Sequence, residues 1–256
     1  MRHEAFAVAG LVAALGAAGC RQSASGPSAF DSVLLPLART TDAFEYRFAA
    51  GDTVDVEWQE AYHRWAVEAL QIPAPRRIRY NKYRDRAHMQ QVIGVGNSNA
   101  FADAGTFEIH TIWSRDNHET VHLYASAFGR PGALWNEGLA VALQVDPVAG
   151  DFVPRWSGVA LDDRVRQFAS DGRLLPLVDL ATTSGFRRFD ANVTYPEAGA
   201  FVRFVMDTCG LPGIRALFAS GSVDDSAEAV GSKFKTACRQ TLSSAEQAWR
   251  ARLGIR

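Results

Sequence analysis

Between residues 40 and 112, the spacing of apolar and polar positions switches between strand-like and helix-like. Apolar residues recur at every second position in three segments, which are predicted to be strands: 44–48, 77–80 and 106–112. Residues 53–71 carry large apolar side chains near helical spacing and end before Pro73, so this segment is predicted to be a helix. A shorter helix is predicted at 85–93, followed by a loop at 94–100 that is rich in Gly, Asn and Ser.

From residue 115 onward the apolar spacing is helical, with Gly or Pro between most segments. The predicted helices are 115–128, 133–145, 160–170, 196–208, 212–219, 225–238 and 243–254. The predicted fold class is therefore α+β, with a small mixed β-sheet N-terminal lobe packed on the helix at 115–128 and a mostly helical C-terminal lobe. We expect a cleft between the lobes near residues 107–145, with 107–112 at the edge of the sheet.

An apolar run from Ala5 to Gly19 ends at Cys20. The run is too short to span a bilayer as a mature helix, but its length suits the apolar region of a secretory signal. The small residues before Cys20 resemble the bacterial lipobox, whose cysteine is lipidated and becomes the first mature residue. The sequence departs from that motif at Ala17, where a larger aliphatic residue is usual. An ordinary signal cut near Gly19 is the alternative, and both interpretations export the protein.

The lipobox resemblance implies a protein anchored to a membrane of the bacterial cell envelope through lipidated Cys20. It divides the chain into a lipoprotein signal peptide at 1–20, a flexible tether at 21–40 and one domain at 41–256. The start of the tether is rich in Ser, Ala, Gly and Pro, a composition typical of flexible linkers. Arg21 after the cysteine, in place of Asp, favours the outer membrane facing the periplasm over the inner membrane.

Composition narrows the class of protein. Hydrophobic residues make up 47% and charged residues 21%, as in soluble globular proteins, which argues against disorder and against a multi-span membrane protein. The net charge of −1 offers no basic surplus for a phosphate backbone, so no nucleic-acid partner is expected. If Cys20 carries a lipid, Cys209 and Cys238 remain as a pair, and export favours a disulfide between them. Two buried thiols in separate helices are the alternative.

The sequence His118-Glu119-Thr120-Val121-His122 is the main candidate for chemistry. On a helix, residues four apart lie on one face, so both imidazoles can reach a single ion. Zinc accepts neutral imidazole nitrogen, and a catalytic zinc site keeps one position open for water. Glu119 would lie beside that position, where a carboxylate can take a proton from water. The same five residues also occur on helices that bind no metal, with the histidines solvated or in the core.

A third ligand is expected on the next helix. The turn at 129–132 has the right length to send a second helix back along the first. On that helix Glu137 is the only acid in an apolar stretch, and a lone carboxylate there is costly to bury unless it is paired or bound to metal. Gly138 and Ala140 are small, which would let the two helices approach closely. A surface Glu near a helix start is the alternative interpretation of Glu137.

The HExxH residues followed by Trp135-Asn136-Glu137-Gly138-Leu139-Ala140 resemble the gluzincin metallopeptidases, in particular the peptidase MA-like group of small exported bacterial proteins. The resemblance implies a zincin-like fold, zinc as cofactor, His118, His122 and Glu137 as its ligands, and Glu119 as general base. Similarity continues at 194–202 and 242–253. One departure is Val141, which stands where thermolysin-like gluzincins place an acid that supports a ligand histidine.

Tyr195, inside the 194–202 similarity, is the candidate donor to a developing oxyanion, a role that gluzincins give to Tyr or His. A tyrosine that only packs at a helix start is the alternative. Together these features predict zinc-dependent peptide-bond hydrolysis in the cell envelope, with a peptide or protein substrate and Glu119 activating a zinc-bound water. The competing hypotheses are an inactive zinc-binding scaffold or binding lipoprotein, and a helical adaptor in which the HExxH sequence binds no metal.

Overall fold

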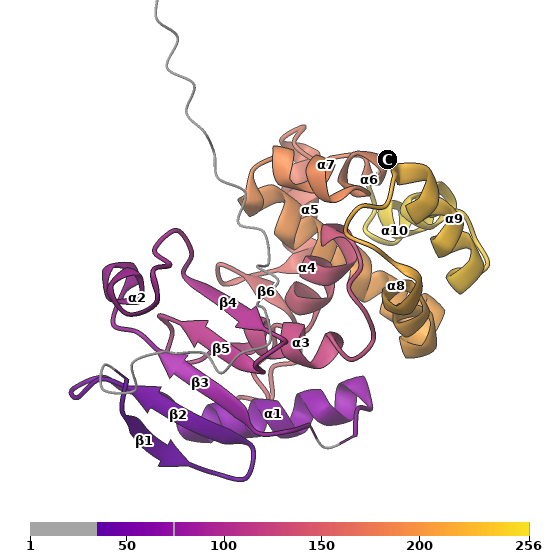
Figure 1. The fold of residues 1–256 in the computed structure, drawn as a ribbon. Coiled ribbons are helices and arrows are strands. Elements are labelled where there is room, and N and C mark those ends of the chain that lie inside the picture. The colour runs from indigo at the N-terminus through magenta and orange to yellow at the C-terminus, as the bar shows by residue number, and fades with distance from the viewer. Residues whose placement is uncertain (1–34, 74, 256) are drawn as a thin grey trace, which may run out of the picture.

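A computed structural model describes residues 35–73 and 75–255, and has a sheet-containing half and a helical half (Figure 1). The predicted signal peptide, its Cys20 and residues 21–34 of the predicted tether lie outside the described residues. The five strands of the main sheet come from the first half of the chain, and most of the helices come from the second. This is the predicted mixed α and β architecture, with helices α3 and α4 between the sheet and the later helices α5 to α10 (Figure 1).

The sheet has five strands in the order β1-β2-β3-β5-β4. Their bounds are β1 Leu37–Thr40, β2 Phe44–Phe48, β3 Ile78–Lys82, β4 Ala100–Asp103 and β5 Glu108–Thr111. Strands β2, β3 and β5 run parallel, while β1 and β4 pair antiparallel at the two edges. Alternation places Phe44 and Tyr46 on the same face as Ile78 and Tyr80, where all four are fully buried.

Two predictions about the sheet were wrong. Strand β1 occupies residues that were assigned to the tether, so the domain begins before the predicted boundary at residue 41. The expected edge at 107–112 contains β5, which lies between β3 and β4, and the edge on that side is β4. The short, alanine-containing β4 gives little alternating signal. Its antiparallel pairing with β5, the next strand in the sequence, defines it as a strand.

Three helices belong to the sheet half: α1 Val56–Leu70, α2 Arg86–Ile93 and α3 Asn117–Ala125. All three were predicted, with ends within a few residues of those observed. Trp58, Tyr62, Ala66 and Leu70 form the buried stripe of α1 and join the core cluster that contains the inner face of the sheet. Helix α3 contacts α1, β4 and β5, so the predicted metal helix packs directly against the sheet.

The helical half begins with α4 Ala133–Ala142 and continues with a hairpin of β6 Arg155–Trp156 and β7 Val159–Ala160. The remaining helices are α5 Leu161–Ser170, α6 Leu177–Leu180, α7 Thr183–Arg188, α8 Ala191–Ser220, α9 Ala227–Cys238 and α10 Leu242–Arg252. The hairpin, α6 and α7 were not predicted, because each is too short to show a period. Helix α8 has a kink at Gly210, where φ is 72°, as expected from the two separate helices predicted there.

The chemistry of the cysteines matches the prediction for an exported protein. Cys209 in α8 and Cys238 at the end of α9 form a disulfide, with their Cα atoms 5.3 Å apart. By closing a loop of about thirty residues, such a bond stabilises the fold by roughly 3 kcal/mol. None of the helices within the described residues is long and apolar enough to cross a membrane.

Helices α4 and α8 make the most extensive helix–helix contact, and glycine makes it possible. A Cβ on Gly138 would lie 2.6 Å from Cγ2 of Val202 and 2.9 Å from the carbonyl oxygen of Ala198. A Cβ on Gly199 would lie 2.4 Å from Cγ1 of Val141. The expectation that Gly138 serves the approach of α4 to the metal helix was therefore wrong. Its missing side chain instead admits α8.

We predict that Gly138→Ala and Gly199→Ala each destabilise the protein by about 1–3 kcal/mol. In both variants the added Cβ would overlap atoms of the facing helix, so the closely packed α4 and α8 would have to move apart. Urea unfolding measures the change. Gly231→Ala in α9 is the matched control, since no atom lies within 4 Å of its added Cβ. There the gain in helix propensity should raise stability by up to about 1 kcal/mol. Equal effects at all three positions would contradict the close-packing argument.

Candidate metal centre

The start of helix α3 is fixed by a buried polar network. Asp116 caps the helix by accepting a hydrogen bond from the backbone N–H of Glu119 at 2.9 Å. The side chain of Gln59, from α1, accepts from the N–H of Asp116 at 3.1 Å. Its amide nitrogen lies 2.9 Å from Oγ1 of Thr120. These bonds tie α3 to α1 and so set the direction in which its histidines point.

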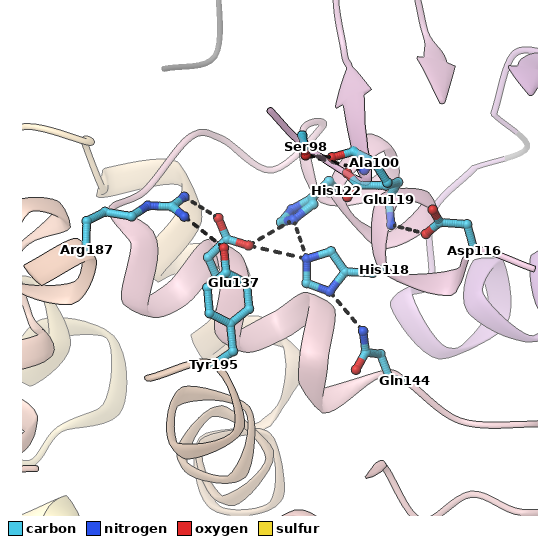
Figure 2. Close-up of polar contacts among 10 residues, drawn as sticks. All are labelled: Ser98, Ala100, Asp116, His118, Glu119, His122, Glu137, Gln144, Arg187 and Tyr195. Carbon is cyan, nitrogen blue, oxygen red and sulfur yellow. Dashed lines mark hydrogen bonds and ion pairs between the residues drawn. The ribbon is translucent and has the colours of Figure 1, made fainter. Parts of the chain in front are cut away.

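The structure brings His118, His122 and Glu137 together at one point between α3 and α4 (Figure 2). Nε2 of His118 lies 3.1 Å from Nε2 of His122. Oε2 of Glu137 lies 3.3 Å from each of these two nitrogens. The three predicted ligand atoms therefore form a nearly equilateral triangle, and these residues could hold a metal ion.

The size of this triangle fits a small tetrahedral ion. Bonds of about 2.0–2.1 Å, which imidazole nitrogen and carboxylate oxygen make to zinc, put tetrahedral ligands roughly 3.3 Å apart. The observed separations of 3.1 to 3.3 Å agree with one face of such a tetrahedron. Two nitrogens and one carboxylate oxygen also match the donor set of a catalytic zinc site with a fourth position left for another ligand.

The neighbouring histidines keep the carboxylate of Glu137 ionised. Burial alone would raise the pKa of Glu137, but hydrogen bonds with His118 and His122 hold it well below its usual range. Burial lowers the pKa of His122, whereas the Glu137 carboxylate outweighs this and raises it to about 9. Because a ligating imidazole must be neutral, metal binding at this site has to displace a proton near neutral pH.

Two side chains that were not predicted from the sequence, Gln144 and Arg187, contact the candidate ligands on the side away from the triangle. The amide nitrogen of Gln144 lies 3.0 Å from Nδ1 of His118. A His118 that binds an ion through Nε2 must carry its proton on Nδ1. Rotating the Gln144 amide by 180° brings its oxygen to this position, where it accepts a hydrogen bond from Nδ1–H. Arg187 in α7 donates a hydrogen bond of 2.6 Å to Oε1 of Glu137, the oxygen that does not face the histidines (Figure 2).

Glu119 lies on the same helix as the histidines and is 8% exposed. Its carboxylate makes no hydrogen bond or ion pair with any residue in the part of the chain that the structure describes. Burial raises the pKa of Glu119 to about 7, although His122 and His118 act to lower it. A carboxylate that is buried, unpartnered and close to neutrality is suited to accept and return a proton.

Tyr195 lies near the start of α8, and its ring stacks on that of His118 with centroids 6.1 Å apart. Its hydroxyl oxygen accepts a hydrogen bond of 2.8 Å from Arg187. The rings of Trp156 and Phe186 flank it, with centroids 5.5 and 5.4 Å away. Burial, followed by the charge of Glu137, raises the pKa of Tyr195, so the phenol keeps its proton and can donate it in a hydrogen bond.

The five predicted site residues thus meet at one place: His118, Glu119, His122, Glu137 and Tyr195. Gln144 lies just beyond the C-terminal end of α4, where helical spacing from Glu137 no longer applies. Arg187 is fifty residues from Glu137 in a helix too short to predict, and no local signal points to it. Val141, in place of the acid of thermolysin-like enzymes, packs against Gly199 of α8.

Comparison with known proteins adds no family to this description. No protein-family model matches the chain, and no curated protein matches its sequence.

One buried carboxyl group lies outside the metal centre. Glu197, two residues after Tyr195, is fully buried, and its Oε2 accepts a hydrogen bond of 3.2 Å from the backbone N–H of Leu175. Its Oε1 has no hydrogen-bond partner within the described residues. Burial raises the pKa of Glu197 to about 8, although the Leu175 N–H and Arg250 oppose the shift.

This shift predicts a pH dependence of stability. Because the pKa of Glu197 is higher in the folded than in the unfolded chain, folding binds a proton, and stability falls as pH rises from about 4.5 to 8. Relative to the wild type, Glu197→Gln should therefore gain stability across this window, on the order of 5 kcal/mol in total, with little further change above it. Urea unfolding at a series of pH values measures the difference, and the exposed Glu228→Gln is the control. A difference independent of pH would contradict the prediction.

Proposed function

We propose that this chain is a zinc-dependent metallopeptidase of the gluzincin type. The observation that carries the proposal is the triangle of two imidazole nitrogens and one carboxylate oxygen. Buried Glu119, on the same helix as the histidines, has no hydrogen-bond or ion-pair partner for its carboxylate among residues 35–73 and 75–255. The sheet packed on the HExxH helix and the helical half that supplies Glu137 are compatible with a zincin-like fold.

In this proposal His118, His122 and Glu137 hold the ion. When bound, zinc supplies Lewis-acid polarisation of the scissile carbonyl and lowers the pKa of water. Glu119 takes a proton from the attacking water and returns it to the nitrogen that leaves as the peptide bond breaks. A pKa of about 7 suits both steps, because the group can gain and lose a proton at neutral pH.

Tyr195 is proposed to stabilise the oxyanion. Arg187 donates to the Tyr195 oxygen, so the hydroxyl hydrogen remains available for a second partner. A preorganised donor of this kind contributes about 3 kcal/mol to the stabilisation of a transition state.

The edge strand β4 is the proposed docking strand for an extended peptide. Among the strands that the structure describes, β4 pairs only with β5, and it contacts α3. Its other edge offers backbone groups to which a peptide can add as a further strand, which would align the peptide beside the metal helix.

The proposed location is the cell envelope, with a lipid on Cys20 and the domain held at the outer membrane facing the periplasm. The Cys209–Cys238 disulfide supports an oxidising compartment. An inactive zinc-binding scaffold is the second candidate function, since the three ligand residues serve it equally well. Glu119 favours the enzyme, because a scaffold gains nothing from a buried carboxylate without a partner.

The metal site can be tested by metal analysis of the full chain extracted in detergent. We expect about one zinc per wild-type chain, and loss of that zinc in His122→Ala, since two remaining ligands hold the ion weakly. His63→Ala is the control, because His63 contacts Tyr124 away from the triangle. Absence of zinc from the wild type, even after zinc is supplied, would refute the proposal and favour the helical adaptor.

Cleavage of a peptide library distinguishes the enzyme from the scaffold. Glu119→Gln should keep the zinc, because Glu119 is not a ligand, and should lower kcat by about 10²–10⁴-fold through loss of the general base. The variant and the wild type should show the same zinc content. Zinc binding with no cleavage by the wild type would instead support the scaffold.

A further inference from the structure

Arg187 connects two groups of the candidate site that lie far apart in the sequence. Its Nη2 donates to Oε1 of Glu137 at 2.6 Å, and its Nη1 donates to the hydroxyl oxygen of Tyr195 at 2.8 Å (Figure 2). The three residues come from different helices, α7, α4 and α8. One guanidinium group therefore fixes the relative position of a metal ligand and a candidate oxyanion donor.

The contact with Arg187 gives the two carboxylate oxygens of Glu137 different partners. Oε2 faces both ligand histidines at 3.3 Å, while Oε1 is held by the arginine. Rotation about the last torsion of a Glu side chain is soft, so a free carboxylate could turn both oxygens toward an ion. The charge-assisted bond to Arg187 opposes that rotation and keeps Glu137 a ligand through one oxygen.

The contact with Tyr195 orients its hydroxyl. Since the guanidinium has donors only, the phenol oxygen must accept, and its own hydrogen must point elsewhere. The ring is held by Phe186, the residue before Arg187, whose centroid lies 5.4 Å away. Helix α7 thus contacts both the ring and the oxygen of Tyr195.

We infer that Arg187 is a positioning residue that couples the metal ligand to the oxyanion donor: it keeps Glu137 monodentate and directs the Tyr195 hydroxyl toward substrate. This inference rests on the proposed function. Arginine suits the role because its planar fork reaches two acceptors at once, whereas a lysine ammonium is a single point charge. Half of the Arg187 side chain is exposed, so its replacement does not open a cavity in the core.

The test compares Arg187→Gln and Arg187→Lys with Arg188→Gln in the full chain. Arg188 is the matched control because it carries the same charge on the same helix, but its guanidinium lies over the ring of Phe189, 4.7 Å from the centroid. Zinc affinity is measured by competition with a chromophoric chelator. The visible absorption of the cobalt(II)-loaded protein reports coordination number, and peptide cleavage gives kcat and KM separately.

We expect Arg187→Gln to lower zinc affinity by about 10–100-fold, to shift the cobalt spectrum toward higher coordination and to lower kcat with little change in KM. Arg187→Lys, which can serve one acceptor, should recover part of the zinc affinity but not kcat. Tyr195→Phe should lower kcat without changing zinc affinity. Its effect and that of Arg187→Gln should be less than additive in the double variant.

The inference is overturned if Arg187→Gln matches Arg188→Gln in zinc affinity, cobalt spectrum and kcat. In that case zinc binding and cleavage by the wild type would leave the proposed function standing. Failure of the wild type to bind zinc would remove the proposed function and the inference together. If the wild type binds zinc without cleaving peptides, the affinity and the spectrum still decide whether Arg187 holds Glu137. Circular dichroism and thermal unfolding of each variant establish that it is folded, and Arg187→Lys replaces Arg187→Gln if the latter is not.

Discussion

The close crossing of helices α4 and α8 is the constraint on which the candidate site depends. Gly138 and Gly199 leave no space for a side chain at this crossing, so the two helix axes are fixed against each other. Glu137 directly precedes Gly138, and Tyr195 lies one turn before Gly199. Setting one crossing therefore places both a candidate metal ligand and the candidate oxyanion donor. The polar network of Gln59, Asp116 and Thr120 does the same for α3 and its histidines.

The charges of the site explain why so many ionisable groups can be buried together. Glu137 interacts with two histidines and an arginine, and its hydrogen bonds with the histidines hold its pKa well below the usual range despite burial. Glu119 has no such partner, and burial raises its pKa to about 7. Two carboxylates on neighbouring helices thus differ in protonation behaviour because Glu137 makes direct hydrogen bonds with both histidines, whereas Glu119 feels the same histidines only through their charge. This difference suits Glu137 as a candidate ligand and Glu119 as a candidate base.

The sequence predicted those parts of the site that are encoded locally. The HExxH spacing places two imidazoles on one helical face, and Glu137 was identified as the one acid in an apolar helix. Strand β4 and residue Arg187 were missed for different reasons. Strand β4 is short and gives little alternating pattern, although it pairs with the next strand in the sequence, whereas Arg187 depends on Glu137 fifty positions away. Gly138 was identified as permitting a close approach, but the sequence could not tell which helix approaches it.

The side chains that support the candidate ligands, Gln144 and Arg187, are not acids. Thermolysin-like gluzincins have a supporting acid at the position of Val141, and the packing of Val141 shows why an acid does not fit there. Its side chain fills the space against Gly199, so a carboxylate there would be buried in the α4–α8 crossing. His118 is instead supported by the neutral amide of Gln144, and Glu137 by the cation of Arg187. A neutral acceptor makes the imidazole a weaker donor than a carboxylate would, and a guanidinium withdraws charge from its partner. Both groups would lower the electron density delivered to a bound ion and so strengthen its action as a Lewis acid. The orientation that Arg187 imposes on Glu137 would maintain the affinity of the site for the ion despite this loss of charge.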